Sequence, residues 1–211
     1  MVRVLNNTHF ERMDESEDSH FYRKPRLNSH VDSHARSALE EFLYELLPTD
    51  GDVLDLMAGY NSHIRNSSNY RQVIGLGLNK EELLQNKHLT QRVLQDINLL
   101  PTLPFQSSFL DAVLISFAVQ YLTKPYEIFE EMGRILQPGG ICCISYSQRM
   151  FLTKSVSVWK VCSDADRARL IAEYFEESKL FENIRFDEVT PEMTDTDPAY
   201  VISANRNHKT A

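Results

Sequence analysis

The stretch Gly51-Asp-Val-Leu-Asp-Leu-Met-Ala-Gly59 predicts a buried β-strand that runs directly into a tight turn. Val53, Leu54 and Leu56 are apolar enough for a strand that is covered on both faces. Asp55 interrupts this run, and a carboxylate is costly to bury without partners. The small residues after the strand let a backbone approach a ligand closely. A strand, an acid and a small-residue loop of this kind form a nucleotide-type site in an open α/β sheet.

Strand-like and helix-like patterns alternate along the rest of the chain. Further strands are expected at residues 72–78, 91–95, 108–115, 141–146, 181–189 and 200–204. Helices are expected at residues 33–47, 79–84, 126–136 and 164–178. Such alternation is typical of an α/β fold with a mostly parallel sheet and helices on both of its faces.

Length and composition indicate one soluble domain. The 211 residues carry a net charge of −8, which argues against non-specific binding to nucleic acid. No apolar run approaches the roughly 18 residues of a membrane span. The three cysteines lack the spacing of a disulfide framework, which favours a reducing, cytoplasmic location. Residues 1–20 contain an acidic run and are predicted as a flexible tail, with a single domain at 21–211.

Several motifs together resemble the class I S-adenosylmethionine-dependent methyltransferases over residues 35–147. Within that superfamily the chain looks most like type-11 methyltransferase-like proteins of poorly defined substrate. The motifs that carry this second likeness are Phe21-Tyr22, Pro25-Arg26, His30, Asp32, Asp55-Leu-Met57, Ser62-His63, Gly75 to Asn79 and Arg149 to Lys154. The resemblance implies one Rossmann-like, doubly wound sheet of about seven strands, with an antiparallel closing strand. It also implies S-adenosylmethionine as the cofactor.

The resemblance assigns a set of cofactor-binding residues, and the sequence departs from the family at two of its usual features. The predicted residues are Asp55, Met57, Ala58, Gly59, Leu78, Asn79, Asp96, Ile97 and Phe117. The first loop has a single glycine where the family has two or three. Gly77 stands where an acidic residue normally binds the ribose. Asn79 either binds the ribose instead or caps the next helix, and Asp96 either accepts the adenine amino group or forms a turn.

Asp55 has two readings as well. It either orients the first loop and meets the cofactor amino group through water, or it caps the backbone turn that follows.

The predicted catalytic residues are His30, His63, Gln120, Tyr121 and Arg149. Both histidines are expected in one pocket at the carboxyl ends of the strands, with Arg149 beside them. Gln120 and Tyr121 follow the fourth strand, where they either face the ligands or pack at a helix start. Arg149 and Lys154 either receive an anionic group of the substrate or are surface charges.

A metal site is the less favoured reading of the histidines. His30, Asp32 and His34 have a spacing that suits metal ligands, but only His63 is evident as a further partner. Both His30 and His63 are therefore interpreted as pocket histidines, and no metal is predicted.

The sequence thus predicts a methyltransferase that acts on a small molecule, anionic if the two cations face it. The alternative is a methyltransferase-fold protein with a degenerate cofactor site, which binds a ligand or catalyses a reaction without methyl transfer. Neither nucleic acid nor a membrane is an expected partner, and no pattern selects an oligomeric state.

Overall fold

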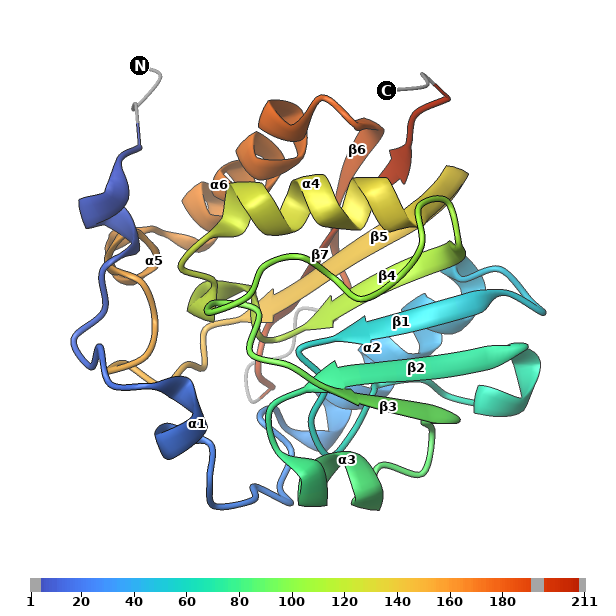
Figure 1. The fold of residues 1–211 in the computed structure, drawn as a ribbon, viewed down its shortest axis with the longest axis horizontal. Coiled ribbons are helices and arrows are strands. Elements are labelled where there is room, and N and C mark those ends of the chain that lie inside the picture. Colours follow the sequence, from blue (N-terminus) through green and yellow to red (C-terminus); the bar gives the residue numbers. More distant parts are fainter. Residues whose placement is uncertain (1–4, 191–195, 209–211) are drawn as a thin grey trace.

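The computed structural model describes residues 5–190 and 196–208. Its centre is a seven-stranded sheet in the order β3-β2-β1-β4-β5-β7-β6 (Figure 1). The strands are β1 (Asp52–Leu56), β2 (Gln72–Gly77), β3 (Gln91–Leu94), β4 (Leu110–Ser116), β5 (Leu136–Ser147), β6 (Phe181–Glu188) and β7 (Ala199–Arg206). The first five are parallel, and β7 runs antiparallel to both β5 and β6. The predicted Rossmann-like fold is therefore confirmed.

Helices cover both faces of the sheet (Figure 1). The helices are α1 (Asp18–Phe21), α2 (Ser33–Leu46), α3 (Lys80–Gln85), α4 (Pro125–Ile135), α5 (Ser157–Val161) and α6 (Asp164–Ser178). Three short 3-10 turns are η1 (Asn7–Phe10), η2 (Ser67–Asn69) and η3 (Val119–Tyr121). No helix in the described ranges is long and apolar enough to cross a membrane.

The core divides into two layers because successive strand residues point to opposite faces of the sheet. Leu54 of β1 packs in one layer with α4 and α6. Its neighbour Val53 packs in the other layer with α2 and α3. The continuous apolar run of β1 therefore serves both layers, as expected for a strand that is covered on both sides.

The N-terminal segment, residues 5–32, runs past the carboxyl ends of the parallel strands (Figure 1). Phe10 is buried, with its ring centroid 5.9 Å from that of Tyr126. Asp18 is also buried, and its carboxylate lies 2.7 Å from Arg12 Nη1 and 3.1 Å from Lys154 Nζ. This packing differs from the flexible tail predicted for residues 1–20, of which residues 1–4 lie outside the described ranges. The acidic run is ordered because it meets two buried cations.

Candidate functional site

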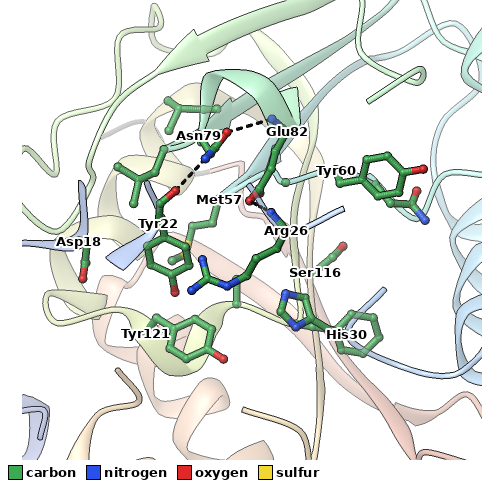
Figure 2. A pocket seen from close by; sticks show the side chains of 18 of the residues that line it. Asp18, Tyr22, Arg26, His30, Met57, Tyr60, Asn79, Glu82, Ser116 and Tyr121 are labelled. Carbon is green, nitrogen blue, oxygen red and sulfur yellow. Dashed lines mark hydrogen bonds between the residues drawn. The ribbon is translucent and has the colours of Figure 1, made fainter. Parts of the chain in front are cut away.

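A pocket lies at the carboxyl ends of β1, β2, β3 and β4, beneath the N-terminal segment (Figure 2). This is where ligands bind in open α/β sheets. The sheet contributes residues 57–61, 76–79, 95–98 and 116–118 to the lining. The N-terminal segment contributes Asp18, Tyr22, Arg26 and residues 28–30, and Phe151 closes one side from the loop after β5. The pocket is thus enclosed by segments from both halves of the chain.

The structure gathers most of the predicted site residues at this pocket. Every predicted cofactor residue lines it except Asp55, which lies within β1. Of the predicted catalytic residues, His30, His63 and Tyr121 line the pocket. Gln120 and Arg149 are not among its lining residues.

Arg149 does not share a pocket with the two histidines, which corrects the prediction. Its side chain is 60% exposed, and its Nε lies 2.8 Å from Oδ1 of Asp197. Gln120 is buried but supports the chain after β4, because its Nε2 donates to the Phe117 carbonyl at 2.8 Å. Lys154 is fully buried against Asp18, so it is neither a surface charge nor a free cation for a substrate.

The first loop is held without the usual glycines. Met57 follows β1 with a φ of 61°, a left-handed conformation that is uncommon outside glycine. The Ala58 amide donates to the Leu76 carbonyl at 2.8 Å. Asn86, fully buried after α3, donates to the Gly59 carbonyl at 3.0 Å and to the Ser62 hydroxyl at 2.9 Å. Asn86 thus fixes the loop from outside, a role that no sequence pattern indicated.

Asp55 and His63 are both buried near this loop, each with a side-chain atom that lacks a partner. Burial raises the pKa of Asp55 to about 7, although a hydrogen bond with Ser62 opposes this shift. Burial, followed by the charge of nearby His30, lowers the pKa of His63 to about 3. Between about pH 3 and pH 7 the structure therefore favours a protonated Asp55 and a neutral His63.

Gly77 and Asn79 settle the geometry at the end of β2. A Cβ atom on Gly77 would lie 2.1 Å from the Ala58 carbonyl oxygen, so this position has no room for a side chain. Asn79 caps α3, since its Oδ1 accepts from the Glu81 and Glu82 amides at 2.9 and 3.0 Å. Its Nδ2 donates to the Tyr22 carbonyl at 2.8 Å (Figure 2) and to the Arg23 carbonyl. These four hydrogen bonds use the full capacity of the amide, which favours the capping role.

Asp96 forms the predicted turn, and its contact with the adenine amino group stays a prediction. Its Oδ1 accepts from the amides of Asn98 and Leu99 at 3.0 and 3.2 Å, which is the expected turn. The same residue lines the pocket next to the buried Ile97. The turn bonds use one carboxylate oxygen, so a ligand amino group can meet the other.

Arg26 is a site residue that the sequence marked only as part of a motif. Its guanidinium carbon lies 4.6, 5.1 and 4.9 Å from the ring centroids of Phe21, Tyr22 and Phe151. Figure 2 shows the guanidinium between Tyr22 and His30. Nη2 donates to the Phe21 carbonyl at 3.2 Å, whereas Nη1 is buried and has no partner. The pocket therefore contains a cation with an unused donor.

No metal-binding cluster forms within the described ranges, where no group of three or more His, Cys, Asp or Glu side chains converges. Asp32 instead caps α2, accepting from the amides of His34 and Ala35 at 2.8 and 2.9 Å.

Comparisons with known proteins agree with this geometry. Residues 54–144 match the family model of a methyltransferase domain. A search of curated proteins gives no match. Among solved structures, the chain is similar to one from the complex between the Haloferax volcanii Trm112 methyltransferase activator and a methyltransferase. That pair has a TM-score of 0.62 and 14% identity, covering 84% of this chain and 92% of the other.

Two further solved structures show the same fold. A SAM-dependent methyltransferase from Aquifex aeolicus has a TM-score of 0.59 and 18% identity, covering 83% of this chain and 94% of its own. The [4+2]-cyclase SpnF has a TM-score of 0.61 and 14% identity, and the match covers 82% of this chain and 81% of SpnF. Residues 54–144 therefore resemble a methyltransferase domain, and the chain has the fold of S-adenosylmethionine-dependent methyltransferases of known structure.

Proposed function

We propose that this protein transfers a methyl group from S-adenosylmethionine to a small molecule that carries an anionic group. The methyltransferase domain implies the cofactor. The unused donor of Arg26 in the pocket supports the anionic acceptor. The enclosure of the pocket by Phe151 and by six residues of the N-terminal segment favours a small acceptor over a macromolecule.

The residues of the pocket fit the cofactor. The backbone at Gly59 is open, because a Cβ atom there would meet only the Glu82 carboxylate, at 3.1 Å. Leu78, Ile97 and Phe117 supply apolar surface of the kind that packs on an adenine ring, and Asp96 supplies an acceptor for its amino group. Met57 to Gly59 would lie against the methionine part.

When bound, the cofactor supplies an electrophilic methyl group, and the chain has to hold an acceptor in line with it. Arg26 would orient the acceptor by its anionic group, since a guanidinium can grip a carboxylate with two hydrogen bonds. Tyr22 and Tyr121 line the same space, and burial raises the pKa of both phenols. Both hydroxyls therefore stay protonated at neutral pH and can donate hydrogen bonds.

His30 suits the role of general base better than His63. A base is needed only where the acceptor atom carries a proton. The pKa of His63 is lowered to about 3, which makes this imidazole a weak base at neutral pH. His30 lies near the Arg26 guanidinium, and burial followed by that charge lowers its pKa, so it is neutral and able to accept a proton.

Calorimetric titration tests the cofactor directly. Both S-adenosylmethionine and S-adenosylhomocysteine should bind the wild-type protein, and the absence of binding by either at millimolar concentration would overturn the proposal. The anionic acceptor is tested by titrating small carboxylates into the protein loaded with S-adenosylhomocysteine. Arg26→Gln should abolish carboxylate binding, while Arg149→Gln, outside the pocket, should not change it.

A reaction without methyl transfer is the second candidate. The single glycine of the first loop and the side-chain-free position at Gly77 favour it, as does the likeness of the fold to a [4+2]-cyclase. Incubation with S-adenosylmethionine and a panel of small acceptors separates the two candidates. Formation of S-adenosylhomocysteine with any acceptor supports methyl transfer, whereas bound cofactor that is never consumed supports the alternative.

A further inference from the structure

The end of β2 offers no side chain that could accept the hydroxyls of a bound nucleoside. A ribose presents two neighbouring hydroxyl donors, and a carboxylate is the acceptor that can receive both at once. Gly77, at the end of β2, leaves no space for any side chain, and the Asn79 amide is fully engaged. The acceptor for the hydroxyls has to come from another element.

Three carboxylates line the pocket in the described part of the chain: Asp18, Glu82 and Asp96. Asp18 is committed to Arg12 and Lys154, and it also accepts from Asn98 Nδ2 at 2.9 Å. Asp96 stands at the end of β3 and shapes the turn that follows. Glu82 is the remaining acid.

Glu82 lies where the ribose would meet the first loop. Asn79 ends the extended chain and starts α3, which turns Glu82 back over Gly59. The Oε2 atom of Glu82 would be 3.1 Å from a Cβ atom placed on Gly59, so it stands directly above the open backbone of the loop. The Oε1 atom accepts from the Arg26 amide at 2.7 Å. No ion pair to Glu82 is found among the described residues, although its side chain is buried.

We infer that Glu82 binds the ribose hydroxyls of the cofactor, in place of an acidic residue at the end of β2. This inference rests on the proposed function. The Oε2 atom receives the hydroxyls, while Oε1 keeps its bond to the Arg26 amide. The same carboxylate therefore joins the cofactor to the N-terminal segment that covers it.

The test compares two ligands, S-adenosylhomocysteine and an analogue that lacks both ribose hydroxyls. Wild-type protein should bind the analogue about tenfold or more weakly, the usual effect of losing hydrogen bonds to a charged acceptor. Glu82→Gln should weaken S-adenosylhomocysteine by a similar factor and bind both ligands with nearly equal affinity. Glu81→Gln is the matched control, because Glu81 is exposed on the same helix and should keep the wild-type ratio.

The ratio of the affinities for S-adenosylhomocysteine and for the analogue shows whether Glu82 contacts the ribose or only supports the N-terminal segment. If Glu82→Gln weakens both ligands but keeps the wild-type ratio, Glu82 only holds Arg26, and the inference is overturned. Equal affinity of the wild-type protein for the two ligands overturns it as well, without any variant that has to fold. If wild-type protein binds neither ligand, the proposed function itself fails.

Discussion

Asp55 and His63 are two buried residues whose pKa values are shifted in opposite senses, so their effects on stability oppose each other. The pKa of Asp55 rises from 3.8 to about 7, so folding is favoured at low pH and this contribution is lost as the pH rises towards 7. The pKa of His63 falls from 6.5 to about 3, so its contribution is present above pH 6.5 and is lost as the pH falls towards 3. Between 3.8 and 6.5, the ordinary pKa values of the two groups, their opposite effects on the pH dependence of the unfolding free energy cancel.

Substituting Asp55 or His63 alone should reveal how the other residue makes the unfolding free energy depend on pH. Relative to wild type, the unfolding free energy of Asp55→Asn should rise with pH between 4 and 6.5, and that of His63→Asn should fall, each by about 1.4 kcal/mol per pH unit. Asn is chosen at position 63 because it tolerates the φ of 53° there. Urea unfolding at several pH values measures both. Parallel curves for a variant and the wild type would show that the substituted group does not titrate as described.

Gly77 should be intolerant of any side chain. Gly77→Ala is expected to lower the unfolding free energy by about 1–3 kcal/mol or more, the cost of overpacking, because the clash is with the backbone of Ala58. Gly59→Ala is the control, since its Cβ atom would meet only the flexible end of Glu82. Denaturant unfolding compares the two. A stable Gly77→Ala variant would mean that the first loop can move away from β2.

Individual residues were predictable where a strand end alone decides their position. Met57, Asn79 and Asp96 line the pocket because each follows a parallel strand. The predicted placement of Arg149 in the pocket was wrong because its side chain pairs with Asp197. Asp197 comes from the segment before β7, and no local sequence pattern links that segment to Arg149. The surroundings of Arg26 depend on Phe151, a residue that is distant in sequence.

A network of ion pairs holds the N-terminal segment, and its charged residues should contribute unequally to stability. Asp18→Asn should cost about 3–5 kcal/mol, because it leaves the fully buried Lys154 without its main charge partner. Lys154→Met should cost less, because Asp18 keeps its bonds to Arg12 and Asn98. Asp14→Asn is the control, since Asp14 lies 3.5 Å from Lys154 and is partly exposed. Urea unfolding ranks the three variants, and equal losses for Asp18→Asn and Asp14→Asn would contradict this account.

Helices and strands were predictable from the periodicity of apolar residues. The distant side chains that a segment packs against were less predictable. The apolar run of β1 and the capped stripe of α2 follow from local sequence. The acidic run at residues 14–18 has no apolar period, and its packing depends on Lys154, more than a hundred residues later. A local pattern cannot reveal a charge partner of that kind.

Ligand binding should stabilise the whole molecule and the segment above the pocket together. At about 100 times its dissociation constant, S-adenosylhomocysteine should raise the unfolding free energy by about 2.7 kcal/mol. Because Asp18, Tyr22, Arg26 and residues 28–30 line the pocket, the amides of this segment should exchange more slowly in the complex. Hydrogen exchange followed by mass spectrometry measures this, with α6 as the internal reference. Protection limited to residues 57–61 would show that the N-terminal segment does not close over the ligand.

The position of β7 has a consequence for how the protein is made. β7 lies between β5 and β6 and pairs with both. The ribosome makes β6 before β7, so β6 has no neighbour in the sheet until residues 199–206 have been made. During that interval the nascent chain presents an unpaired edge on β5, which is open to other strands. Translation that stalls between β6 and β7 would therefore leave an aggregation-prone intermediate, although every residue that lines the ligand pocket has already been made.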